Sequence, residues 1–200
     1  MRTPGPGEWA SERVSQGFVA DYKPFAFVDG EGVRCSLYVS GCLFACAGCF
    51  NESAWSFRYG QPYTDELEET ILADLAQEYV QGLTLLGGEP FLNTGVCLRL
   101  ARRVREVFGT TKDIWCWSGY TFEQLMAETP DKLALLEHLD VLVDGPFVLA
   151  ERDLTLQFRG SRNQRVLDVP TSLASRAAAV WAGGVDAHES YEQLERRPLI

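Results

Sequence analysis

Hydrophobic and polar residues follow two different periods along the middle of the chain. Val33–Val39 alternates apolar with polar side chains, which predicts a β-strand. Short apolar runs bounded by turn-forming residues predict four further strands, at Leu83–Leu86, Ile114–Trp117, Val141–Val143 and Gln164–Val169.

Between these strands, apolar residues recur every three to four positions, which is the period of an amphipathic helix. Thr64 suits the N-cap of a helix that reaches about Val80, and Gly109 suits the end of a helix over Gly95–Phe108. The expected buried face of the first helix consists of residues spaced four apart: Leu67, Ile71, Leu75 and Tyr79.

Shorter helices are expected in the second half of the chain. Thr121 and Gln124 have the spacing of a capping box, and Pro130 suits the first turn of a helix that extends to about His138. Another helix is expected at Ala174–Trp181. Strands that alternate with helices in this way predict a parallel sheet with right-handed crossovers.

The length of the chain limits this fold to part of a barrel. A complete (βα) barrel of eight units takes about 250 residues, whereas 200 residues leave room for about five or six units. We therefore expect an α/β fold, an open partial (βα) barrel of about five to six parallel strands. The expected organisation is a loose N-terminal lead-in at 1–17, the barrel domain at 18–169, and a C-terminal helix and tail at 170–200.

Three cysteines lie close together immediately after the first predicted strand. They are Cys42, Cys46 and Cys49, in the loop from Gly41 to Phe50. Thiolates are the ligands of iron–sulfur clusters, and three of them leave one iron of a [4Fe–4S] cube without a protein ligand. An open iron can bind a substrate, so the spacing favours a catalytic cluster over a simple electron carrier.

Other interpretations of these cysteines remain open at this stage. The pair Cys46 and Cys49 alone has the spacing of a thioredoxin-like dithiol or of half a zinc site. A zinc site usually needs a second pair of ligands, and the only histidines are His138 and His188. A zinc-binding interaction module is therefore the non-enzymatic alternative. The remaining cysteines fall in predicted strands and a helix and are interpreted as core packing: Cys35, Cys97 and Cys116.

A second motif follows the strand at Leu83–Leu86, namely Gly87-Gly88-Glu89-Pro90. Two glycines after a strand allow a backbone to approach a ligand closely, because no Cβ intervenes. A glutamate beside them can accept hydrogen bonds from an ammonium group. The same sequence also suits an ordinary strand-to-helix turn, so its combination with the three cysteines is what makes it specific.

The two motifs together resemble those of the radical S-adenosylmethionine (SAM) superfamily. Over residues from about 25 to 167 the chain resembles a family of glycyl radical enzyme activases, the activating proteins of the anaerobic ribonucleoside-triphosphate reductase. The segments that carry this resemblance are Val33–Cys42, Cys49–Asn51, Ser53–Trp55, Gly60–Pro62, Asp113–Tyr120, Asp140–Phe147 and Arg159–Gln164.

The resemblance implies a site and a reaction. It implies that the three cysteines hold one [4Fe–4S] cluster per chain and that the fourth iron binds the amino acid end of SAM. The residues expected to bind the cofactor are Gly48, Cys49, Phe50, Gly87, Gly88, Glu89, Ser118 and Asp144. The reduced cluster then cleaves SAM, and the 5′-deoxyadenosyl radical takes hydrogen from a glycine of the reductase. A low-potential donor such as flavodoxin or ferredoxin is the expected source of electrons.

Two positions depart from related activases. Many relatives in the superfamily have a bulky apolar residue just before the third cysteine, whereas this chain has Gly48, as is usual in the reductase activators, so either Phe50 or no residue stacks on adenine. Related activases also often have a lysine two residues after the strand-end aspartate, where this chain has Pro146. Candidates to pair with the cofactor carboxylate are then Arg159, Arg162 and Arg165.

Composition narrows the function classes further. The net charge of −10 argues against binding to nucleic acid phosphates. No apolar run approaches the roughly 18 residues of a membrane span, and no secretory signal is recognisable, so we expect a cytoplasmic protein with reduced thiols. Two enzymatic alternatives remain, an activase of another glycyl radical enzyme such as pyruvate formate-lyase, and a small radical enzyme that acts on a free metabolite.

Overall fold

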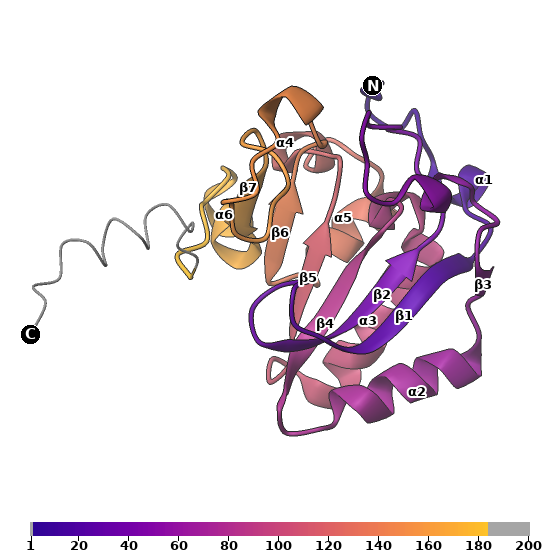
Figure 1. Cartoon of the computed structure of the whole chain (residues 1–200). Coiled ribbons are helices and arrows are strands. Elements are labelled where there is room, and N and C mark those ends of the chain that lie inside the picture. The colour runs from indigo at the N-terminus through magenta and orange to yellow at the C-terminus, as the bar shows by residue number, and fades with distance from the viewer. Residues whose placement is uncertain (1, 184–200) are drawn as a thin grey trace, which may run out of the picture.

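The computed structural model describes residues 2–183, and a single mixed sheet forms its centre (Figure 1). Within these residues the sheet has seven strands in the order β3-β1-β2-β4-β5-β6-β7. The strands are β1 (Phe18–Ala26), β2 (Val33–Val39), β3 (Gln61–Pro62), β4 (Val80–Gly87), β5 (Asp113–Trp117), β6 (Val141–Asp144) and β7 (Arg165–Asp168).

The middle of the sheet is parallel and its edges are antiparallel. β2, β4, β5 and β6 run parallel to one another, so the described residues contain four mutually parallel strands and not the five to six expected. β1 returns directly into β2 through a short connection, which requires an antiparallel pair. β7 likewise pairs with β6 in the antiparallel sense. β3 pairs with β1 only at Phe18 and Val19, and the β1–β2 register is interrupted at two places.

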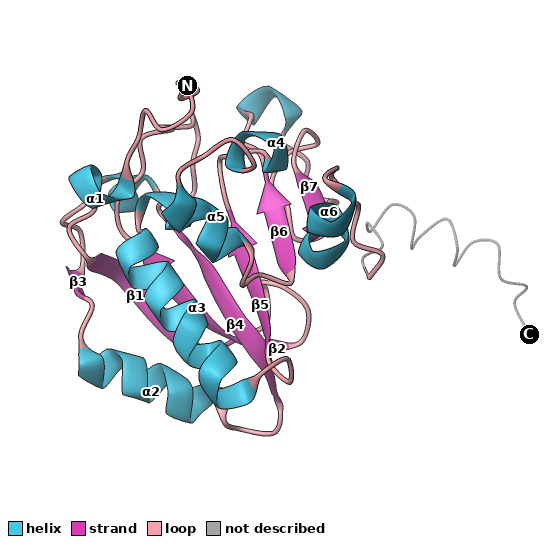
Figure 2. Ribbon diagram, turned by 180° about the vertical axis from the view of Figure 1, so that it is seen from behind, coloured by secondary structure: helices cyan, strands magenta, loops and turns pink. Residues whose placement is uncertain are grey.

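Helices cover one face of this sheet, where Figure 2 shows α3 and α5 in front of the strands and α2 along their lower end. The α-helices are α1 (Ser11–Val14), α2 (Asp65–Leu75), α3 (Thr94–Phe108), α4 (Phe122–Leu125), α5 (Pro130–Leu136) and α6 (Val169–Ser175). Short 3-10 helices lie at Glu52–Trp55, Pro90–Leu92 and Leu149–Glu151. Among residues 2–183, no helix combines the length and the apolar character that crossing a bilayer requires.

The hydrophobic core lies between the sheet and these helices. Leu37 of β2 and Leu85 of β4 are fully buried there, against Leu100 of α3. Cys35, Cys97 and Cys116 belong to the same core, as their positions in predicted elements indicated. The opposite face of the sheet is also covered but carries polar groups. Buried Arg34 bonds there to Thr84 and pairs with Asp113.

Several predicted helix boundaries are confirmed. The Thr64 side chain accepts a hydrogen bond from Leu67 N, and Thr121 forms the capping box with Gln124. Gly109 ends α3 with a positive φ of 59°, a conformation that glycine adopts without steric cost.

Two helix predictions are wrong. α2 ends at Leu75 instead of about Val80, because Val80 is the first residue of β4. Tyr79, predicted on the buried face of the helix, is therefore in the connection and is exposed. In place of the predicted helix at Ala174–Trp181, the structure has α6 at Val169–Ser175, and it is the last helix within residues 2–183. Residues after α6 return alongside β7, with a bridge between Leu167 and Val180.

The N-terminal segment expected to be loose is packed from Trp9 onward. The indole of Trp9 is buried, and α1 lies against α3. Residues 184–200 of the predicted tail lie outside the described part of the chain.

A buried ion pair at the start of α5 generates a testable prediction. The Lys132 ammonium lies 3.1 Å from a Glu128 carboxylate oxygen, and both side chains are almost completely buried. Replacing Lys132→Met leaves the Glu128 charge without its cation, which should lower the free energy of unfolding by about 3–5 kcal/mol. Chemical denaturation of the metal-free protein measures this loss. The double variant Lys132→Met/Glu128→Gln should regain part of it, and a double variant less stable than the single one would contradict the prediction.

Candidate metal centre

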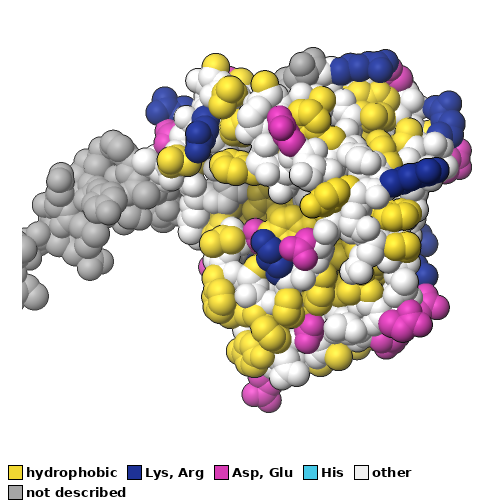
Figure 3. Space-filling model, turned by 45° about the vertical axis from the view of Figure 1, so that its right-hand side comes forward, with side chains coloured by type: hydrophobic (Ala, Val, Ile, Leu, Met, Phe, Trp, Pro, Cys, Tyr) yellow, Lys and Arg dark blue, Asp and Glu magenta, His cyan; other side chains and the backbone are white. Residues whose placement is uncertain are grey.

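Loops from neighbouring parallel strands meet around one cavity at their carboxyl ends. The cavity has a volume of about 140 Å³. The sequence-predicted residues that line it come from the loops after β2, β4 and β5: Cys42, Cys46, Cys49, Gly87, Gly88, Glu89 and Ser118. The two motifs therefore lie side by side, as their positions at strand ends indicated. The space-filling view of the face opposite α3 shows a hollow with hydrophobic side chains in its depth (Figure 3).

Backbone N–H groups from the cysteine loop, from Asn51 and from the loop after β6 point at the three sulfur atoms. Cys42 receives them from Phe44 and Ala45, and Cys46 from Phe147. The Asn51 N–H lies 3.3 Å from Cys49 Sγ. Such hydrogen bonds stabilise electron-rich thiolates, and they are among the features that tune the potential of an iron–sulfur cluster.

Three thiolates around one cavity suit a cluster. In a [4Fe–4S] cube each cysteine binds a different iron, so the sulfurs surround the cluster and do not converge on one point. No three His, Cys, Asp or Glu side chains in residues 2–183 form a group that could hold one metal ion. The donor set and the N–H groups aimed at it therefore fit the cluster that the sequence predicts.

Burial controls the protonation of these thiols in the metal-free protein. Loss of water raises the pKa of Cys42 to about 12, and the nearby Glu89 carboxylate adds to the effect. Burial also raises the pKa of Cys46, and the adjacent Cys49 contributes in the same direction. Both thiols are therefore protonated at neutral pH, so iron binding must release their protons.

Gly41 forms the junction between the cysteine loop and the Gly-Gly-Glu turn. Its carbonyl oxygen accepts hydrogen bonds from Glu89 N at 2.9 Å and from Asn93 Nδ2 at 3.4 Å. A Cβ at Gly88 would lie 2.6 Å from the same oxygen, and a Cβ at Gly87 would lie 2.8 Å from Tyr38 Cα. These glycines therefore allow the turn to approach the backbone of β2 and of the loop after it. The sequence analysis had explained the same two glycines by the close approach of a ligand.

Glu89 joins the ends of β4 and β5. One carboxylate oxygen accepts from Phe91 N at 3.1 Å and from the Ser118 hydroxyl at 2.8 Å, and the other accepts from Gly119 N at 2.8 Å. Its side chain is almost completely buried, and loss of water raises its pKa to about 7 in spite of these donors.

Three predicted cofactor-binding residues do not line the cavity. Asp144 is buried beside it, where its oxygens accept from Phe122 N at 2.8 Å and from Arg165 Nε at 2.9 Å. Gly48 packs near Leu149, and Phe50 is 76% exposed. Their contacts with a cofactor stay predictions.

The three candidate arginines differ in their partners. Arg162 pairs with Asp153 at 2.8 Å, and Arg165 pairs with both Asp144 and Glu123. Arg159 donates to the backbone oxygen of Gln164 at 3.2 Å. To bind the carboxylate of a cofactor, Arg162 and Arg165 would have to release their present carboxylate partners or pair with two carboxylates at once.

Sequence reasoning missed several residues that line the cavity: Phe44, Asn51, Trp55 and Gln164. Asn51 Nδ2 donates to the Gly87 oxygen at 3.3 Å, and Gln164 Nε2 donates to the Gly145 oxygen at 2.9 Å. Apart from Phe44, each lies in one of the segments that carry the family resemblance, which was the available signal.

The buried Glu89 predicts a pH-dependent stability. Because its pKa is raised from 4.5 to about 7, the folded state holds a proton that the unfolded state has lost between these values. The contribution of Glu89 to the free energy of unfolding should therefore fall as pH rises from about 4.5 to about 7. Urea denaturation of the metal-free parent and Glu89→Gln proteins measures it as the difference between the two. A difference that stays constant across this range would contradict the assignment.

Comparison with known proteins extends these observations. A family model described as "4Fe-4S single cluster domain" matches residues 28–167. A Vibrio cholerae protein named anaerobic ribonucleoside-triphosphate reductase-activating protein is 44% identical over 147 residues, which cover 72% of this chain and 92% of the relative. Proteins of the same name from Escherichia coli K12 and Enterobacteria phage T4 are 42% and 40% identical. They match 72% of this chain over 94% and 88% of their own lengths. The chain therefore belongs to the family of anaerobic ribonucleoside-triphosphate reductase-activating proteins.

Proposed function

We propose that this protein activates an anaerobic ribonucleoside-triphosphate reductase by reductive cleavage of SAM at a [4Fe–4S] cluster. The observation that carries the proposal is the single cavity where the three-cysteine loop and the Gly-Gly-Glu turn meet. Relatives with the activating-protein name support the choice of partner.

The fold supports a finer structural proposal. The parallel strands β2, β4, β5 and β6 are consecutive in the sheet, and the loops that line the cavity follow their carboxyl ends. Enzymes with (βα) barrels build their sites at this end of the strands. We therefore assign the sheet to an open partial barrel of the radical SAM type.

In this proposal Cys42, Cys46 and Cys49 each hold one iron. When bound, the cluster and SAM supply the electron and the 5′-deoxyadenosyl radical for hydrogen abstraction. The backbone of Gly87–Glu89 would bind the amino end of SAM, and the Ser118 hydroxyl would contact its ribose or methionine part. Glu89 keeps its hydrogen bonds to the β5 loop, which fixes the direction of this turn.

The outer predicted residues would act at the edge of the cavity. The backbone of Gly48–Phe50 would lie along the adenine, and the Phe50 ring lies 6.4 Å from the Phe147 ring, so a base has an aromatic surface to stack on. Asp144 would hold the start of α4 in place by accepting the hydrogen bond from Phe122 N. It would also contact the ribose or methionine of SAM.

The name of the relatives favours a protein as substrate. A cavity that opens at the surface would be accessible to the glycine-bearing segment of a reductase. That segment must leave its own folded site, so we expect modest affinity. A low-potential protein such as flavodoxin or ferredoxin would supply the electron.

The cluster assignment predicts the effect of single cysteine changes. Cys42→Ala, Cys46→Ala and Cys49→Ala should each lower iron and sulfide content after anaerobic reconstitution and abolish the formation of methionine from SAM. Cys97→Ala is the matched control, because this thiol is buried in the core on the helix side. Parent-level cleavage by the Cys46→Ala protein would show that the ligand assignment is wrong.

The partner assignment predicts a radical on the reductase. The reduced protein with SAM should generate the doublet of a glycyl radical in electron paramagnetic resonance when the reductase of the same organism is added. A reductase with alanine at the radical glycine should give no doublet. A doublet that forms only on another glycyl radical enzyme, such as pyruvate formate-lyase, would transfer the function to that partner. Turnover of a free metabolite without any partner would refute activation.

A further inference from the structure

An N-terminal segment outside the matched residues 28–167 packs directly against the cysteine loop. The Trp9 ring lies 5.1 Å from the Phe44 ring in an edge-to-face contact, and 6.3 Å from the Tyr120 ring. Phe44 stands between Cys42 and Cys46 in the sequence and lines the cavity. Trp9 therefore contacts the one aromatic side chain that lies between two of the proposed iron ligands.

Phe44 has little freedom once Trp9 is in place. A Cβ at Gly119 would lie 2.6 Å from its ring, and Tyr120 contacts it from another side at 5.1 Å. The backbone of Phe44 and Ala45 supplies the N–H groups near Cys42. The position of the Phe44 ring thus fixes the backbone that orients this sulfur.

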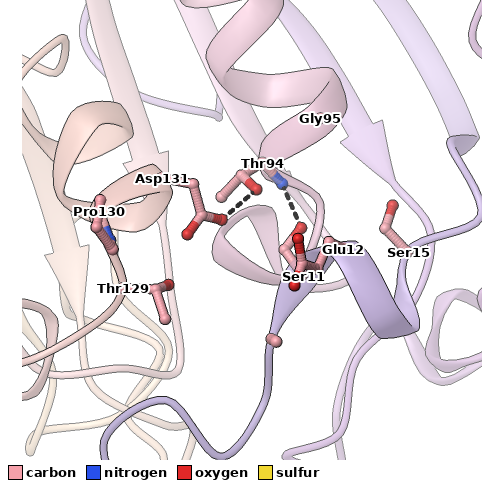
Figure 4. A pocket seen from close by; sticks show the side chains of 9 residues that line it. Ser11, Glu12, Ser15, Thr94, Gly95, Thr129, Pro130 and Asp131 are labelled. Atoms are coloured by element: carbon pink, nitrogen blue, oxygen red, sulfur yellow. Dashed lines mark hydrogen bonds between the residues drawn. The ribbon is translucent and has the colours of Figure 1, made fainter.

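The segment itself is attached by buried polar groups. Lys132 Nζ donates to the Trp9 carbonyl oxygen at 2.9 Å, and Gly7 N donates to Glu128 at 3.1 Å. The first backbone N–H of α3, at Thr94, donates to Ser11 Oγ at 3.0 Å (Figure 4). Ser11 therefore caps α3 from a distant part of the sequence.

The same segment also reaches the other half of the site. The Ser15 hydroxyl donates to Asn93 Oδ1 at 2.8 Å, and Asn93 Nδ2 donates to the backbone carbonyl oxygens of Glu89, at 3.0 Å, and of Gly41. Asn93 is fully buried. Residues 7–15 thus support both the cysteine loop and the Gly-Gly-Glu turn from behind.

Packing between the segment and the helices is incomplete. A cavity of about 500 Å³ lies between α1 and the starts of α3 and α5, lined among others by Glu12, Ser15 and Thr129 (Figure 4). The aromatic contact of Trp9 and the polar contacts described above therefore contribute to the attachment of the segment.

We propose that Trp9 is a positioning residue for the cysteine loop and that it acts through Phe44. Its contact holds Cys42 and Cys46 in the arrangement that the cluster requires. The consequence for catalysis rests on the proposed function, whereas the effect on the loop does not.

Thiol alkylation of the metal-free protein tests this directly. The rates at which N-ethylmaleimide modifies individual cysteines, resolved by peptide mass spectrometry, should rise about tenfold at Cys42 and Cys46 in the Trp9→Ala variant, because the loop opens locally. Cys97 and Cys116 are fully buried in the core and report global opening. Their rates should remain near those of the parent.

Two further variants separate positioning from general stability. Trp9→Phe keeps an aromatic edge on Phe44 and should return Cys46 to within about threefold of the parent rate. Ile71→Ala removes a fully buried side chain from α2, remote from the loop, and should not change the ratio of the Cys46 rate to the Cys97 rate. If Trp9→Ala leaves this ratio unchanged, including the case in which all cysteines react together, the proposal is overturned.

The loaded protein gives an independent readout. Trp9→Ala should release iron to a chelator several-fold faster than the parent, and Trp9→Phe should restore the parent rate. Equal release from Trp9→Ala and the parent would overturn the proposal. A parent that takes up no cluster at all would instead refute the proposed function, while the alkylation result would still decide the position of the loop.

Discussion

The backbone contact between Gly41 and the Gly-Gly-Glu turn is the constraint on which the site depends. The cysteine loop follows β2 and the turn follows β4, and these strands are neighbours, so their ends have to share a narrow space. A carbonyl oxygen that accepts hydrogen bonds from the opposite loop satisfies buried polar groups on both sides. A Cβ at Gly41 would lie 2.0 Å from the Phe57 ring, so neither partner of this contact tolerates a side chain without movement.

Around this contact the protein buries charges that it must then satisfy. Glu89 has three hydrogen-bond donors, and Lys132 has the Glu128 carboxylate, a hydroxyl and a carbonyl oxygen. Burying such groups costs free energy, and the cost rises when one hydrogen-bond partner is lost. They therefore favour the one packing arrangement in which all partners are present, more than they add to stability. These hydrogen bonds form in the absence of a cofactor, so part of the site is already arranged before binding, which lowers the ordering cost.

Local sequence signals predicted the elements whose determinants are local. The caps at Thr64 and Thr121 and the end of α3 at Gly109 depend on neighbouring residues alone, and they are confirmed. The convergence of the two motifs was predictable because parallel strands end at one edge. Asp144 was interpreted as facing the cofactor, but its direction depends on Arg165, which comes from a different strand.

Other features had no local signal. β1 is largely exposed and lacks a regular apolar period, so no strand was predicted there. The burial of Trp9 depends on Phe44, Tyr120 and Lys132, which are far away in the sequence. A single tryptophan among polar residues gives no period, and its role becomes visible only when the fold brings these partners together.

β1 also bears on how the molecule behaves at high concentration. β3 covers only its first two residues, so within residues 2–183 the rest of β1 is an edge strand with unpaired backbone groups. Such an edge is a template for strands of other copies. Pro24 provides no N–H, Lys23 places a charge along the edge, and two irregularities in register twist it. These features oppose the pairing of β1 with a strand of another copy, so they disfavour self-association along this edge.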